Sequence, residues 1–291
     1  MEKLSLLLFS NSEFLILLCF TFIILGIGYF LYRLEYFKID KHRSILSLVL
    51  MMMIYAIISF WKLGSTRFPT TTWQPVAEKQ QITFDFGKSE KFDAIYTIYG
   101  EGDTNSNPSA YQIGTNQIQI YASNDLKDWV HIASLNQGNI YTYAIEQGNW
   151  QYRYIKLINL NNNSSLTEIG FRNEDHTGFL PVSILRDKQK DGPYPGSLLI
   201  DEQDKLVLSP TYYDQAYFDE IYHVRNAWEI ANGQYMYANV HPLLGTNIIA
   251  LSIHLFGMNP LAWRLPGAIA GVFMLPVLYG ILKLLLKRDN L

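Results

Sequence analysis

The sequence predicts an α-helical membrane protein with an all-β sandwich inserted between its membrane segments. Two observations lead to this fold class, and a third bears on the partner. Hydrophobic residues make up 49% of the 291 residues and gather toward the two ends of the chain. The middle is polar, rich in tyrosine and built from short alternating runs typical of strands. The net charge of -3 offers no basic surface, so no nucleic-acid partner is expected.

Two apolar runs within residues 1–63 predict two spanning helices. The first, residues 14–32, carries no charge, and about 20 apolar residues cross the hydrocarbon core of a bilayer. It is long for a signal peptide, and basic residues follow it rather than precede it. The second run, residues 45–61, ends at Trp61 and Lys62, a pair typical of a membrane–water interface. The basic loop between the runs is expected in the cytoplasm and the chain after Lys62 outside.

Residues 76–172 are predicted to form an extracytoplasmic β-sandwich. Alternating runs such as ITFDFG and AIYTIYG are separated by turn-forming stretches at the spacing of a sandwich. Residues 173–216 contain four prolines and few apolar runs, so we expect an extended return segment to the membrane. The one cysteine, Cys19, lies in the first apolar run, which excludes a disulfide framework and a cysteine metal site.

Residues 217–263 are predicted to form an outer loop with two amphipathic helices. In residues 219–231 apolar side chains recur at helical spacing, and Asp219 and Glu220 stand at the start. Residues 247–256 are apolar but too few to cross a bilayer, so an interfacial or re-entrant helix is expected.

Residues 264–291 are predicted to hold the third spanning helix and a short cytoplasmic end. The apolar run contains Pro266 and Pro276, and basic residues follow it. The prediction is therefore a multi-pass protein of a bacterial plasma membrane, with the sandwich and the outer loop outside. A cysteine-free outer domain favours a bacterial surface over a eukaryotic secretory lumen.

Four motifs follow one another in the middle domain: FDFG at 84–87, YASNDLKDW at 121–129, YRYIKL at 152–157 and LTEIGF at 166–171. Together they resemble the discoidin-like, galactose-binding jelly rolls. The resemblance implies a jelly-roll sandwich. It leaves open whether the domain binds a cell-wall glycan, carries a calcium ion in its loops, or is a folded spacer, because a fold does not fix a function.

The outer loop contains an ordered series: FDE at 218–220, HPLLGT at 241–246 and FGMNPLAWR at 256–264. The series resembles the first outer loop of the C-type glycosyltransferases, in particular the protein O-mannosyltransferases and their bacterial relatives. The resemblance covers residues 217–279. It implies inverting transfer of a sugar, such as mannose or another hexose, from a polyprenyl-phosphate donor to an acceptor hydroxyl. Asp219 would be the general base.

Each candidate site residue also has a purely structural interpretation. Asp219 and Glu220 are catalytic carboxylates, or they only stabilise a helix N-terminus through its dipole. His241, Arg225 and Arg264 bind the donor and its phosphate leaving group. Alternatively, His241 is a polar loop residue, Arg225 a surface charge and Arg264 an anchor at the membrane interface.

Two departures from the family pattern keep a second function open. Leu243 and Thr246 stand where the family has Pro and Lys, and losing such a Lys removes a contact of roughly 1.5–3 kcal/mol. Three spanning helices would also be too few to wall a lipid-donor groove. The chain is interpreted as the N-terminal part of such an enzyme: a fragment, a frameshifted copy, or half of a split protein that a second chain completes. Alternatively, it is a membrane-anchored module that binds a glycan or a partner. No cofactor is expected, and no His, Asp and Glu spacing indicates a metal site.

Overall fold

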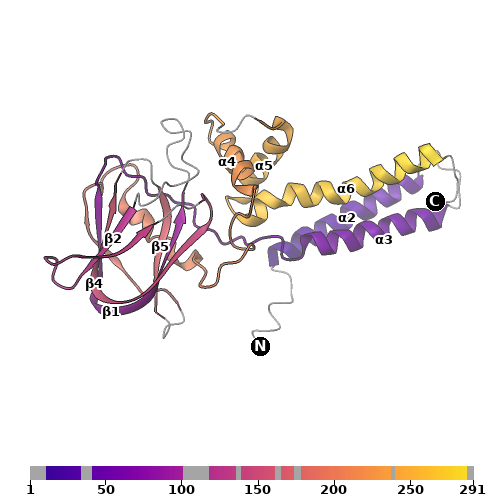
Figure 1. Ribbon diagram of the computed structural model, residues 1–291. Helices are drawn as coiled ribbons and strands as arrows, with labels where there is room; N and C mark the ends of the chain where they lie inside the picture. Colours follow the sequence, from indigo (N-terminus) through magenta and orange to yellow (C-terminus); the bar gives the residue numbers. More distant parts are fainter. Residues whose placement is uncertain are drawn as a thin grey trace. The chain divides into compact units, whose positions relative to one another are not determined.

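The computed structural model describes residues 11–33, 41–100, 118–135, 139–160, 165–173, 178–236 and 240–286. The chain divides into two compact units, a helical unit (Met1–Thr66 with Leu261–Leu291) and a β-rich unit (Arg67–Pro260) (Figure 1). Each unit has its own hydrophobic core.

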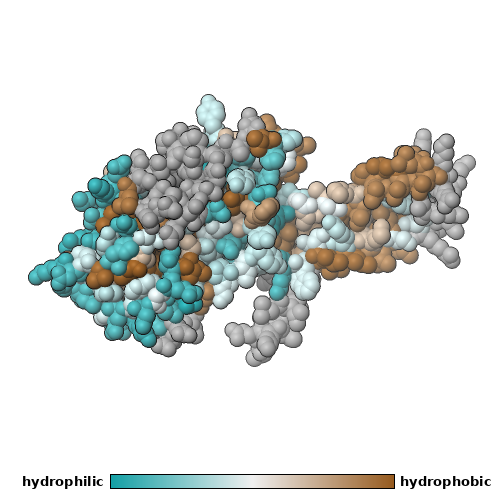
Figure 2. Space-filling model, in the orientation of Figure 1, coloured by the Kyte–Doolittle hydropathy of each residue, from teal (hydrophilic) through white to brown (hydrophobic). Residues whose placement is uncertain are grey.

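The helical unit contains α2 (Asn11–Arg33), α3 (Lys41–Phe60) and α6 (Pro260–Leu286). The ring of Phe20 lies 5.0 Å from that of Phe60 and 6.0 Å from that of Phe273, so all three helices meet there. Their outward faces carry exposed leucine, isoleucine and methionine side chains, which colour much of this unit as hydrophobic in Figure 2.

The prediction of three spanning helices, and with it the fold class, is wrong. Within the described residues one helix, α6 with 27 residues, is long and apolar enough to cross a membrane. The apolar parts of the other two helices, Leu15–Tyr29 and Ser44–Phe60, are shorter. They fall below the length of about 20 residues that the hydrocarbon core requires. The larger unit is an antiparallel β domain, so the chain is a β-rich protein with one candidate span, and a multi-pass arrangement is not supported.

The described strands of the β-rich unit form one antiparallel sheet in the order β3-β2-β4-β1-β5, and β6 pairs with β1. In chain order the strands are β1 (Gln81–Tyr99), β2 (Ile118–Ser123), β3 (Val130–Leu135), β4 (Tyr143–Asn159), β5 (Leu166–Arg172) and β6 (Ser183–Asp187).

A bend in β1 lets this sheet fold over itself. The register with β4 shifts between Asp85 and Glu90, and Gly87 between them has a φ of 82°, a value that suits glycine. The first half of β1 pairs with β6 and the second half with β5. One strand therefore contributes to both layers, as the curved ribbons of β1 and β4 show in Figure 1. The buried apolar side chains between the layers form the core, and they include Trp73, Ile82, Phe84, Phe92, Ile155, Leu157, Ile169 and Phe171.

The return segment and the outer loop also belong to the β-rich unit. Besides β6, the segment forms two short 3-10 helices, Gly196–Leu199 and Gln203–Lys205. The outer loop forms α4 (Glu220–Ala231) and α5 (Leu243–Phe256), which pack against each other. The helix α5 begins four residues earlier than the apolar run suggests, directly after Pro242.

Candidate functional site

The two predicted catalytic carboxylates lie at the start of α4. Glu220 Oε2 accepts a hydrogen bond from the Tyr217 backbone N–H at 3.0 Å, so this carboxylate closes the turn before the helix. Asp219 occupies the N-cap position, is exposed, and makes no capping hydrogen bond through its side chain. The structural role is therefore filled by Glu220, and the Asp219 carboxylate faces solvent.

His241 lies beside a second imidazole, that of His223 on α4. Their ring centroids are 5.0 Å apart, and the ring planes are inclined by 42°. His223 follows Asp219 by four residues and Glu220 by three, so it lies one turn further along the same face of the helix. The loop before α5 thus brings His241 to the face of α4 that begins with the carboxylates. The prediction omitted His223, although its spacing from Asp219 was visible in the sequence.

Arg225 is directed into the protein rather than toward that face. Its Nε donates a hydrogen bond to Glu229 Oε1 at 2.8 Å, and both side chains are 0% exposed. The surface-charge interpretation of Arg225 is therefore wrong. The two residues lie one helical turn apart on the buried side of α4, so the ion pair stabilises the helix itself.

Arg264 lies in α6 and belongs to the helical unit. Its Nη1 donates a hydrogen bond to the Leu63 carbonyl oxygen at 3.0 Å, which links the start of α6 to the segment after α3. Its role toward a phosphate stays a prediction. In the described part of the chain, no group of three or more His, Cys, Asp and Glu side chains could hold a metal ion.

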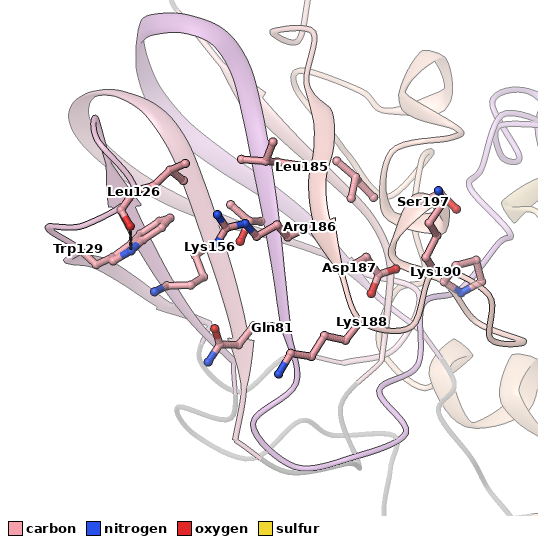
Figure 3. A pocket seen from close by; sticks show the side chains of 13 residues that line it. Gln81, Leu126, Trp129, Lys156, Leu185, Arg186, Asp187, Lys188, Lys190 and Ser197 are labelled. Carbon is pink, nitrogen blue, oxygen red and sulfur yellow. Dashed lines mark hydrogen bonds between the residues drawn. The ribbon is translucent and has the colours of Figure 1, made fainter.

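A second candidate site is a groove of about 760 Å³ on the β-rich unit (Figure 3). Side chains from β1, β4 and β6, from the turn after β2 and from the loop after β6 line it. On β1 and β4 the lining residues alternate with core residues, so their side chains lie on the face of the sheet opposite the core. On β6 the four consecutive residues Ile184–Asp187 line the groove.

Direct cross-strand register places five residues in one row on this face. His131 pairs with Tyr121, Tyr121 with Lys156, Lys156 with Thr83, and Thr83 with Arg186. Neighbouring strands are about 4.8 Å apart, which puts the backbones of Lys156 and Arg186 roughly 10 Å from each other. Two cations thus flank one hydroxyl.

Lys156 is held by aromatic rings. Its Nζ lies 3.8 Å from the centroid of the Trp129 ring and 5.8 Å from that of Tyr121. The Trp129 Nε1–H donates to the Leu126 carbonyl oxygen at 3.2 Å, which fixes the indole. Burial lowers the pKa of the Lys156 ammonium group, because the charged form has lost part of its water. The charge is therefore positioned and partly desolvated.

The rest of the groove adds positive charge. Arg186, Lys188 and Lys190 line it, and Figure 3 shows Lys156 and Arg186 between Trp129 and Asp187. Among the described residues of the lining, Asp187 is the one carboxylate. Its two oxygens accept the backbone N–H groups of Gln189 at 2.8 Å and Gly196 at 2.7 Å, so it shapes the loop.

A buried carboxyl group lies elsewhere in the sandwich, on β5. Glu168 is 0% exposed, and its Oε2 accepts the backbone N–H of Glu202 at 3.1 Å. Desolvation, with the negative charges of Asp201, Glu202 and Asp204 nearby, raises the pKa of Glu168 to about 9. The group is therefore protonated at neutral pH.

No family model matches the chain. Over 72 residues, 23% of this chain, it is 36% identical to a "Polyprenol-phosphate-mannose--protein mannosyltransferase" of Mycolicibacterium smegmatis. The protein of the same name from Mycobacterium tuberculosis is 32% identical over 72 residues. In both cases the match covers 14% of the curated relative, so the chain spans a small part of their length.

Solved structures that match the β domain have low sequence identity to this chain and low TM-scores. "CpGH89CBM32-6 produced by Clostridium perfringens" is 19% identical with a TM-score of 0.29, covering 38% of this chain and 82% of that one. Chitosan-binding module 1, derived from a chitosanase/glucanase of Paenibacillus sp. IK-5, is 14% identical with a TM-score of 0.27, covering 36% and 77%.

Proposed function

We propose that the chain is part of a glycosyltransferase that moves mannose or another hexose from a polyprenyl-phosphate donor to an acceptor hydroxyl. The observation that carries this proposal is the exposed face of α4. There the Asp219 carboxylate, which makes no capping hydrogen bond, lies one turn before His223. The ring of His223 in turn lies beside that of His241. The partial similarity to a mannosyltransferase supports the same reaction class.

In this proposal Asp219 is the general base. Its carboxylate takes the proton of the acceptor hydroxyl as that oxygen attacks the anomeric carbon of the sugar. The new carbon–oxygen bond forms, the bond from the anomeric carbon to the phosphate oxygen breaks, and the phosphate leaves with the electron pair. The imidazoles of His223 and His241 stabilise the charge of the leaving phosphate. Arg225, buried beside Glu229 one turn along the same helix, is a positioning residue that stabilises α4.

The position of Thr246 bears on how the phosphate is held. Thr246, in the first turn of α5, has an uncharged side chain and is 4% exposed. This position therefore offers a ligand no cationic contact. Leu243 at the start of the same helix is 49% exposed and apolar. The phosphate contact is therefore assigned to the imidazole pair. The helix α6 is proposed to tether the chain to the membrane that contains the donor.

Replacing Asp219 by Asn tests the proposal. Membranes containing the chain, alone and together with the product of the adjacent reading frame, are supplied with polyprenyl-phosphate-linked mannose and an acceptor peptide. We expect Asp219→Asn to reduce the rate of mannose transfer about a hundredfold, because the general base is lost. Asp191→Asn removes an exposed carboxylate outside α4 and should leave the rate unchanged. A normal rate in Asp219→Asn would contradict the catalytic assignment.

A second candidate function is favoured by the groove on the sandwich. With one candidate span and a cationic groove on the β-rich unit, the chain can serve as a membrane-anchored module that binds a glycan. A glycan array probed with the full chain in a neutral detergent tests this function. A blank array would leave the sandwich as a spacer or a partner-docking module.

A further inference from the structure

We propose that the groove on the sandwich binds an anionic glycan, a sugar polymer that carries carboxylate or phosphate groups. This inference rests on the second candidate function and specifies the chemistry of its ligand. It depends on the cross-strand row, on the fixed position of Lys156 and on the charge balance of the lining.

The row supplies two positive charges at a set separation. Lys156 and Arg186 are both in register with Thr83, on either side of it. Because a sheet fixes the spacing of its strands, the backbones that carry the two cations are roughly 10 Å apart. An extended polymer with charges at regular intervals can meet both cations.

The ammonium group of Lys156 is preorganised for binding an anion. The contact with Trp129 at 3.8 Å restricts its ammonium group, so less conformational entropy is lost on binding. Its lowered pKa reflects partial desolvation, and an anion in contact would stabilise the charged form. The half-buried indole of Trp129 also gives the groove an apolar plane.

The charges of the lining do not cancel. Among the described residues, none of the lining cations Lys156, Arg186, Lys188 and Lys190 forms an ion pair. The single carboxylate, Asp187, is occupied by two backbone N–H groups. The groove therefore has an excess of available positive charge.

The shape and the polar lining favour a glycan over other anions. A recess of about 760 Å³ accepts a chain that enters it, whereas a flat bilayer surface would meet only its rim. The exposed side chains of Gln81 and Ser197 offer an amide and a hydroxyl group that match sugar hydroxyls. An acidic polypeptide would find fewer partners for its backbone, and it forms a separate arm of the test.

The test measures binding of four polymers to the full chain in a neutral detergent by biolayer interferometry. They are polygalacturonate, poly(glycerol phosphate), neutral dextran and poly-glutamate. The groove variants are Lys156→Gln and Arg186→Gln, and the second of them leaves the Trp129 contact intact. Lys91→Gln removes an exposed positive charge from β1 outside the groove and is the matched control.

We expect polygalacturonate, poly(glycerol phosphate) or both to bind and dextran not to bind. Each groove variant should weaken binding roughly tenfold, because a charge-assisted contact is lost, and Lys91→Gln less than about twofold. Added salt should weaken binding further. Whichever of these two polymers binds more tightly shows whether carboxylate or phosphate is the recognised group.

Three outcomes would overturn the inference. Equal binding of dextran, insensitive to both groove variants, would reject the anionic ligand and leave glycan binding in place. Poly-glutamate binding as tightly as the anionic glycans would assign the groove to acidic polypeptides. No binding of any polymer, together with a blank glycan array, would reject both the inference and the second candidate function.

Discussion

Replacing Glu229 by Leu is expected to lower the free energy of unfolding of the α4 region by about 3–5 kcal/mol. The substitution leaves the Arg225 guanidinium, which is 0% exposed, without the carboxylate that accepts its Nε–H at 2.8 Å. A buried cation that loses its counter-charge keeps its desolvation penalty. Hydrogen exchange of α4 peptides, followed by mass spectrometry in the full chain, measures the loss as faster exchange.

The reciprocal variant and the double variant are the controls. Arg225→Leu should cost a similar amount, since it leaves Glu229 as a buried anion. The double variant Arg225→Leu with Glu229→Leu removes both charges and should be less destabilised than either single variant. If the three effects simply add, the two side chains do not act as a pair. If instead Arg225→Leu impairs mannose transfer with normal exchange in α4, Arg225 acts on the ligand directly.

Replacing Glu168 by Gln is expected to stabilise the sandwich at neutral pH by about 3 kcal/mol. Burial raises the pKa of Glu168 from 4.5 to about 9, so between these values the folded state holds a proton that the unfolded state has released. Stability therefore falls as the pH rises through this window, by about 1.4 kcal/mol per pH unit for this group. Glutamine mimics the protonated acid and removes the dependence.

The measurement compares hydrogen exchange in the β5 peptide of the wild-type chain and the Glu168→Gln variant from pH 4.5 to 9. The two should agree near pH 4.5 and diverge as the pH rises, with the wild type becoming less protected after correction for intrinsic exchange rates. Glu78→Gln, at an exposed position, should follow the wild type throughout. Parallel profiles for wild type and Glu168→Gln would mean that Glu168 ionises normally in the folded protein.

The strands and the start of α4 could be predicted because their signals are local. Alternation of polar and apolar residues identifies the segments around Phe84, Ile155 and Ile169, and the acidic pair identifies the beginning of α4. The prediction of spanning helices depended on the apolar length that a bilayer requires, about 20 residues. The apolar stretches Leu15–Tyr29 and Ser44–Phe60 are shorter than this. The predicted run 14–32 lies within α2, and the run 45–61 lies within α3 except for Trp61, so the helices were placed correctly and only their spanning role was wrong.

The site geometry could not be predicted, because it depends on pairings between distant residues. The strand order places β4 between β1 and β2, so no spacing in the sequence indicates that Lys156 and Arg186 flank Thr83. His223 and His241 meet only because α5 packs against α4. The sequence predicts Arg225 as a donor-binding residue or a surface charge, and its burial beside Glu229 follows from the way α4 packs.

The bend in β1 has a consequence for how the sandwich responds to mechanical load. β1 and β4 are hydrogen-bonded to each other on both sides of the bend. One layer therefore cannot separate without breaking strand pairs that the other layer shares. Under a pulling force the sandwich should therefore rupture in one cooperative event, without a half-open intermediate.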